Sequence, residues 1–199
     1  MPESAEFVFG VDLDGVVADF YSHARCLAAE WFEVPEASLT PAVKKDLAAW
    51  GFPDAISYQR LHRWAVTQRN LFRDMPPIWG ARSALRRLSD DKVRIRIITH
   101  RLYIDRFHQA AVRQTIDWLD HHGIPYRDLC FMADKRAVEA DLYIEDTPEN
   151  IKKLQKAGKE VLIYTNTTNM EIKGERVDDW KAAEDHVRQH LERWRPQSR

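Results

Sequence analysis

One segment near the start of the chain reads Phe7-Val8-Phe9-Gly10-Val11-Asp12-Leu13-Asp14-Gly15-Val16-Val17-Ala18-Asp19-Phe20. Its first half is rich in β-branched and aromatic side chains and leads directly to two aspartates and a glycine. Such short apolar runs are typical of buried strands in parallel sheets, and ligands bind just beyond the carboxyl ends of these strands. The segment therefore predicts an α/β fold with Asp12 and Asp14 at the rim of the sheet.

A simple turn after the strand is the alternative interpretation, because aspartate and glycine both tolerate turn geometry. A turn does not explain two acids so close together at a buried strand end. Clustered carboxylates repel each other unless a cation or a proton offsets their charge. The pattern therefore favours a catalytic site whose remaining groups come from later in the chain.

The composition excludes several classes of partner. The 199 residues carry 31 acidic and 30 basic side chains, which leaves a net charge of -1. A nucleic acid polymer or an anionic membrane would call for a basic surface, so neither is expected. Cys26 and Cys130 lack metal-ligand spacing, residues 1–6 lack the regions of a signal peptide, and no apolar run approaches the ~20 residues of a membrane span. We expect a reduced, cytoplasmic protein.

Strand-like and helix-like patterns alternate along most of the chain, which predicts a Rossmann-like parallel sheet flanked by helices. The exception is residues 16–77, which predict a small helical cap inserted after the first strand; residues 1–15 and 78–199 then form the core. The predicted strands after the first are 93–99, 129–132, 140–144 and 160–164. The predicted helices are 80–90, 104–122, a helix beginning after Thr147, and 178–194, with 19–32 and 57–72 in the cap.

Polar side chains follow four of these predicted strands, and together they suit phosphoryl transfer. They are Asp12 with Asp14, Thr99, Lys135, and Glu145 with Asp146. Carboxylate oxygens can hold Mg²⁺, which keeps several waters and also binds substrate phosphate, so two or three protein ligands suffice. We expect Asp12 and Asp146 to be the side-chain ligands.

Each remaining group has a role in that chemistry. Asp12 can attack phosphorus as a nucleophile, and Asp14 can protonate the leaving oxygen and then accept a proton from water. Lys135 would balance negative charge, and the Thr99 hydroxyl would donate to a phosphoryl oxygen. Taken singly, Lys135 also fits a solvated lysine in a charged loop and Thr99 a β-branched residue at a strand end.

In order and placement, these residues resemble the four motifs of the haloacid dehalogenase superfamily. The resemblance rests on Asp12-Leu13-Asp14-Gly15-Val16, Ile97-Ile98-Thr99, Lys135 and Ile144-Glu145-Asp146. It implies a phosphatase, since an aspartate at position 14 distinguishes phosphatases from other members. It also implies Mg²⁺ held by Asp12, the backbone carbonyl of Asp14 and Asp146. Glu145 departs from the family's common second aspartate and is expected to support the ligands, or else to replace Asp146.

A narrower resemblance, to the 5′(3′)-deoxyribonucleotidase family, covers most of the chain. It rests on Asp12 through Phe20, the helical insertion, Pro76-Pro77 before Gly80-Ala81, and Ile144-Glu145-Asp146. Phe20 matches a family aromatic that stacks on the nucleobase, so a nucleoside monophosphate is the expected substrate. A sugar phosphate or another small metabolite is the alternative, with Phe20 then serving as cap core.

The sequence departs from that family after Thr99, where His100 and Arg101 replace small or neutral residues. These two side chains would bind a second anionic group of the substrate or simply solvate a loop. A catalytically idle scaffold that binds a phosphometabolite or a protein is a further alternative, which the presence of every motif residue argues against.

Two other groups of residues have patterns that can carry a function. His186 and His190 stand four residues apart beside Glu184 and Asp185, a spacing compatible with a metal site on a helix. Without a third ligand, they are predicted to be surface histidines. Trp118, Trp180 and Trp194 fall at helical positions and are expected in packing or in a homodimer contact.

Overall fold

The computed structural model describes residues 6–42, 48–102 and 105–194. Within them, six parallel strands form one sheet in the order β3-β2-β1-β4-β5-β6. The strands are β1 (Val8–Val11), β2 (Arg94–Thr99), β3 (Asp128–Phe131), β4 (Leu142–Glu145), β5 (Val161–Tyr164) and β6 (Arg176–Val177). The expected α/β architecture is thereby confirmed, and the two-residue strand β6 adds an edge that the sequence pattern did not predict.

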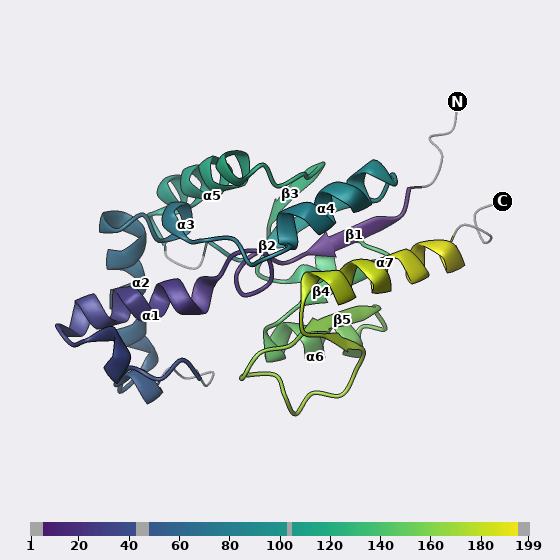
Figure 1. Ribbon diagram of the computed structural model, residues 1–199. Helices are drawn as coiled ribbons and strands as arrows, with labels where there is room; N and C mark the ends of the chain where they lie inside the picture. Colours follow the sequence, from purple (N-terminus) through teal and green to yellow (C-terminus); the bar gives the residue numbers. More distant parts are fainter. Residues whose placement is uncertain (1–5, 43–47, 103–104, 195–199) are drawn as a thin grey trace.

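Helices cover both faces of this sheet (Figure 1). One face packs against α4 (Ala81–Asp90), α5 (His108–His122) and α7 (Trp180–Trp194), and the other against α6 (Pro148–Lys156) and the short helix η3 (Lys135–Ala137). Trp118 of α5 and Trp180 of α7 are both buried in the core. Among the described residues, no helix combines the length and apolarity needed to cross a bilayer.

The register of the central strands brings their carboxyl ends to one level. Val11 of β1 pairs with Ile97 of β2 on one side and with Ile144 of β4 on the other. All three side chains are buried, because each central strand is covered on both faces. The residues that follow them, Asp12 and Glu145 among them, are therefore delivered to the same edge of the sheet.

A helical insertion separates β1 from α4. It contains α1 (Phe20–Phe32), η1 (Glu36–Ser38), η2 (Ala48–Trp50), α2 (Ala55–Gln68) and α3 (Leu71–Asp74). Figure 1 shows α1 and α2 beyond the end toward which β1 points. The insertion has a hydrophobic cluster of its own, which includes Leu39, Trp50, Phe52 and Leu61. The division into a core of 1–15 and 78–199 and a cap of 16–77 stays a prediction.

The predicted helix over 57–72 is in fact two helices, α2 and α3. Asn70 lies between them in the left-handed region, with φ 49°, which asparagine tolerates better than most residues. The buried amide of Gln114, on α5, supports the break: its nitrogen donates to Val66 O at 2.8 Å and its oxygen accepts from Phe72 N at 3.2 Å. Tertiary contact thus overrides the helical pattern.

The helix predicted over 104–122 begins at His108 in the structure. Ile104, the first residue of the predicted range, lies outside the described residues.

Two chain segments join the insertion to the sheet, and they pair with each other. Asp19 N donates to Pro76 O at 2.9 Å and Ile78 N donates to Val17 O at 2.7 Å, around an antiparallel bridge between Ala18 and Pro77. We call residues 17–19 and 76–78 the paired linkers.

Two buried indoles fix the paired linkers and their neighbours to the core. Trp180 donates from Nε1 to Val16 O, and Trp118 donates from Nε1 to Met75 O, each at 2.7 Å. These bonds satisfy backbone carbonyls that would otherwise be buried without a partner.

Replacing Trp180 by phenylalanine should lower the free energy of unfolding by about 1–3 kcal/mol, because the Val16 carbonyl loses its donor. Trp79→Phe is the matched control, since Trp79 is 95% exposed and its replacement should stay within about 0.5 kcal/mol. Urea denaturation of both variants measures the difference. Equal stability of the two variants would contradict the anchoring role of Trp180.

Candidate active site

A buried lysine connects two carboxylates at the carboxyl ends of the central strands. Lys135 Nζ lies 2.7 Å from Asp12 Oδ1 and 2.6 Å from Glu145 Oε2. Asp12 follows β1, Glu145 ends β4, and η3 supplies the lysine. All three side chains are buried. The second oxygen of Glu145 accepts a hydrogen bond from Thr147 N at 3.0 Å, so both of its oxygens are engaged.

Asp146 completes the carboxylate cluster and is held by polar groups from three directions. Its side chain accepts hydrogen bonds from Asn166 Nδ2 at 2.7 Å, from Thr147 Oγ1 at 3.2 Å and from the hydroxyl of Tyr21. Asn169 fixes the backbone beneath it by donating to Asp146 O at 2.8 Å. These contacts orient the fully buried carboxylate of Asp146. One of its oxygens lies within 4.8 Å of an oxygen of Asp12 and of an oxygen of Glu145, which is close enough for the three to bind one metal ion.

When ionised, the three carboxylates of the cluster carry more negative charge than its lysine offsets. Asp12, Glu145 and Asp146 offer carboxylate oxygens within 4.8 Å of one another, against the single ammonium of Lys135. Burial and repulsion from Glu145 raise the pKa of Asp146 to about 7, and the same causes raise the pKa of Asp12 well above its usual range. Burial alone would lower the pKa of Lys135, but attraction to Asp12 and Glu145 raises it. A divalent cation with oxygen ligands fits this excess of buried negative charge.

Thr99 and His100 lie at the end of β2, beside the cluster. The Thr99 hydroxyl is buried and makes no hydrogen bond within the described residues, so it is a donor available to a ligand. The His100 side chain is exposed, and burial of part of its ring together with repulsion from Lys135 and Lys153 lowers its pKa. Its expected contact with substrate stays a prediction.

Arg101 is a buried arginine, so the expectation that it solvates a loop is wrong, and its contact with a second anionic group of the substrate stays a prediction. Only 2% of the residue is exposed. Its guanidinium donates hydrogen bonds to both oxygens of Asp14, at 2.7 and 3.1 Å, and to Thr115 Oγ1 at 3.2 Å. The ring of Phe72 lies 4.5 Å from Arg101 Cζ. The arginine therefore positions Asp14, which the sequence pattern did not indicate.

Phe20 lies at the first position of α1, where it is half-buried between the main core and the cluster inside the helical insertion. Its ring meets that of Tyr21 edge-on, with centroids 5.6 Å apart. Tyr21 in turn bonds to Asp146. Phe20 is therefore linked to the carboxylate cluster through Tyr21. Its stacking on a base stays a prediction.

Gly15 is required where the chain turns after Asp14. Its φ of 84° lies in the left-handed region, and a β-carbon there would lie 2.2 Å from Asp146 Oδ2. Since real β-carbons do not approach oxygen so closely, a side chain at this position would displace Asp146. The glycine of the opening motif thus makes room for the cluster.

The groups that hold Asp146 lie outside the motifs that the sequence indicates. Thr147, Asn166, Asn169 and Tyr21 each contact it or its backbone. A signal for two of them was present, because the polar run 165–169 directly follows the apolar strand β5. The carboxyl-end rule that pointed to Asp12 also applies to this run.

The fold is shared with solved hydrolases of the haloacid dehalogenase type. A HAD-superfamily hydrolase of subfamily IA from Geobacter sulfurreducens shares the fold, with a TM-score of 0.56 at 15% identity over 92% of this chain and 100% of that chain. A haloacid dehalogenase-like hydrolase from Xanthomonas campestris gives 0.57 at 15% identity over 96% and 94% of the two chains.

The family can be stated more narrowly. Residues 6–191 match the model of the 5′ nucleotidase, deoxy (pyrimidine), cytosolic type C protein (NT5C) family, and the chain belongs to that family. It is also 51% identical, over 91% of its length and 90% of the relative, to a Chlorobaculum tepidum protein named "Putative 5′(3′)-deoxyribonucleotidase". The protein is therefore a phosphatase of the 5′-nucleotidase type.

Gly15→Ala should lower phosphatase activity by about 100-fold or more, because a shift of about 1 Å in a positioned group can have that effect. Gly158→Ala is the matched control: its φ of 70° imposes similar backbone strain, but nothing lies within 4 Å of the added carbon. Steady-state kinetics of both variants measure the difference. Similar losses in the two variants would show that strain, and not the contact with Asp146, is the cause.

Proposed function

We propose that the protein is an Mg²⁺-dependent phosphomonoesterase that hydrolyses deoxyribonucleoside monophosphates through a phosphorylated aspartate at Asp12. The supporting observation is the ion pair of Asp12 and Lys135, which is buried beside two further carboxylates at the carboxyl edge of the sheet. An aspartate there can serve as a nucleophile only if nearby positive charge reduces its repulsion of phosphate.

The cation is proposed to be held by Asp12, Asp146 and the backbone carbonyl of Asp14. Glu145 is assigned a supporting role, because Lys135 and Thr147 N already engage its two oxygens. When bound, Mg²⁺ would neutralise charge on the substrate phosphate and help to orient it for attack. The excess of buried carboxylates over ammonium groups favours a divalent cation at this place.

The reaction proceeds in two displacements. A carboxylate oxygen of Asp12 attacks phosphorus, the ester P–O bond breaks, and Asp14 gives its proton to the departing alkoxide. Water then attacks phosphorus of the phosphoaspartate, Asp14 takes a proton from that water, and the bond to Asp12 breaks to release phosphate. Thr99 and Lys135 stabilise the phosphoryl oxygens by hydrogen bonding and charge.

Arg101 orients Asp14 for the second proton transfer, in which the ionised carboxylate takes a proton from water. The bidentate contact leaves little rotational freedom to the carboxylate, whose side chain is 25% exposed while that of the arginine is fully buried. We therefore assign Arg101 to the positioning of Asp14.

The substrate class rests on the family and on the cap. The family description names a deoxy nucleotidase, and the 51% identical relative carries the name of a deoxyribonucleotidase. Phe20 is half-buried beside Tyr21, so its ring can offer a stacking surface without leaving the hydrophobic cluster. His100, exposed at the end of β2, is the remaining candidate for contact with substrate.

Asp12→Asn should reduce Mg²⁺-dependent phosphate release by at least about 10³-fold, because it removes the nucleophile. The assay uses deoxy- and ribonucleoside monophosphates and sugar phosphates. Asp90→Asn, on the exposed side of α4, should leave turnover unchanged. Full activity of Asp12→Asn would overturn the covalent mechanism, and no turnover of any ester by the wild type would favour a binding role.

The same substrate panel separates the candidate substrates. Fastest phosphate release from a deoxynucleotide supports the proposal. Fastest release from a sugar phosphate would instead identify sugar phosphates as the substrate class. In Phe20→Ala, a selective loss with nucleotides indicates base stacking. An equal loss with every ester indicates that Phe20 only packs the cap.

Mg²⁺ should raise the melting temperature more at pH 8 than at pH 6. In the metal-free fold the pKa of Asp146 is raised to about 7, above its unfolded value, so its protonated form stabilises that fold at low pH and this contribution is lost as pH rises through 7. The cation requires the ionised form and restores stability there. Thermal unfolding with Mg²⁺ or with a chelator measures the effect. Asp146→Asn should flatten the pH dependence, and a wild-type shift independent of pH would contradict the assignment.

A further inference from the structure

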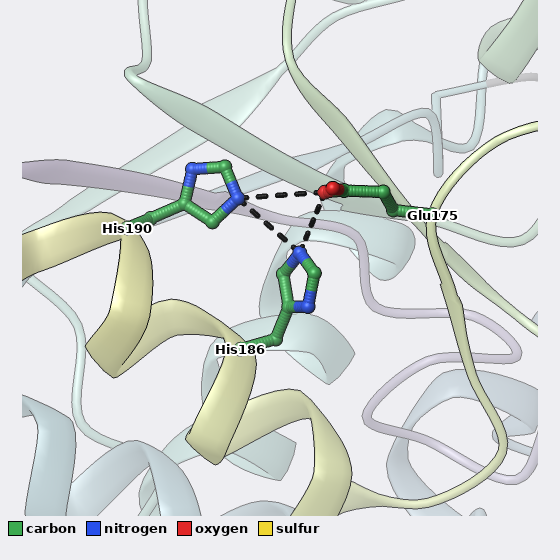
Figure 2. Close-up of side chains that lie close together, drawn as sticks. All are labelled: Glu175, His186 and His190. Carbon is green, nitrogen blue, oxygen red and sulfur yellow. Dashed lines mark hydrogen bonds and ion pairs between the residues drawn. The ribbon is translucent and has the colours of Figure 1, made fainter. Parts of the chain in front are cut away.

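A second group of candidate metal ligands lies near the amino ends of the strands, whereas Asp12 lies at their carboxyl ends. His186 and His190 are one turn apart on α7, and Glu175 immediately precedes β6. Figure 2 shows both rings directed at the Glu175 carboxylate. The sequence pattern predicted surface histidines because no third ligand was evident; the fold supplies Glu175. Glu184, the acid next to them in sequence, is instead paired with Arg87 and Arg188.

The three ligand atoms form a compact triangle. His186 Nε2 lies 2.7 Å from Glu175 Oε2, His190 Nε2 lies 3.5 Å from the same oxygen, and the two nitrogens are 3.2 Å apart. Ligands around a tetrahedral Zn²⁺ are roughly 3.3 Å apart. A point about 2 Å from all three atoms lies roughly 1 Å outside their plane, and an ion there would need the pair that is 2.7 Å apart to separate by about 0.6 Å to reach tetrahedral spacing.

Hydrogen bonding accounts for this triangle less well than a cation does. Each Nε2 is directed at one carboxylate oxygen, so two N–H groups would crowd a space in which the nitrogens are only 3.2 Å apart. If only one of the two Nε2 atoms carries a proton, that single N–H is the one donor for all three close contacts among Glu175, His186 and His190. A divalent cation accepts all three lone pairs at once.

The surroundings suit a bound cation with one open position. His190 and Glu175 line a pocket of about 340 Å³, together with the acids Asp141 and Glu160 and the cation Arg193. Burial and the charge of Arg193 lower the pKa of His190, which favours the neutral ring that binds metal.

We propose that Glu175, His186 and His190 bind one Zn²⁺-like transition-metal ion, with a water or a small ligand from the pocket in the fourth position. Two imidazoles and one carboxylate favour such an ion over Mg²⁺, which prefers oxygen ligands and octahedral geometry. The ion joins α7 to the loop before β6, and so ties the last helix to the edge of the sheet. This site is separate from the proposed chemistry at Asp12.

The test is calorimetric titration of the full-length, metal-stripped protein with ZnCl₂ in excess Mg²⁺, which occupies the oxygen-rich cluster. The wild type should bind one equivalent of Zn²⁺. At about 100 times Kd, Zn²⁺ should raise the melting temperature by about 5–10 °C. His190→Gln and Glu175→Gln should each weaken binding at least about 100-fold, since even indirect ligand partners contribute about 10–100-fold.

His121→Gln is the matched control, because His121 is exposed at the end of α5 and pairs only with a neighbouring ring among the described contacts. It should bind Zn²⁺ as the wild type does. Circular dichroism and unchanged phosphatase activity verify that the ligand variants are folded. Absence of one-equivalent binding in the wild type, or equal affinity in His190→Gln, would overturn the proposal.

Discussion

The buried ammonium of Lys135 is the interaction on which the carboxyl edge of the sheet depends. It joins Asp12, after β1, to Glu145, at the end of neighbouring β4, and both carboxylates are buried. Removing one member of such a pair leaves an uncompensated buried charge, which typically costs about 3–5 kcal/mol. The alignment of the central strands, the tight turn at Gly15 and the polar groups around Asp146 all serve to hold these charges at fixed positions.

Much of this arrangement follows from local sequence. Apolar runs ending in Asp12, Thr99 and Glu145 predicted the strands, because central parallel strands are buried on both faces and their ends carry the polar side chains. Lys135 could be placed beside them because it follows another such run. These features depend on composition within a few residues, which is the range over which pattern carries information.

Other features depend on residues far apart in the chain and could not be obtained in the same way. Gln114 breaks the helical pattern at Asn70 through contacts more than 40 positions away, and Arg101 finds Asp14 across 87 positions. Glu175 becomes a partner of His186 only because a two-residue strand lies beside α7. The sequence shows which side chains are charged, but the tertiary structure determines which of them form ion pairs.

The paired linkers also bear on how such a protein can change over evolution. The insertion leaves and rejoins the sheet at chain ends held together by Asp19 N to Pro76 O at 2.9 Å and Ile78 N to Val17 O at 2.7 Å. Because the two ends are adjacent, a segment of different length can span them at little additional entropic cost. The insertion can therefore be exchanged for one of different length while the sheet and the carboxylate-lysine cluster at its carboxyl edge are kept.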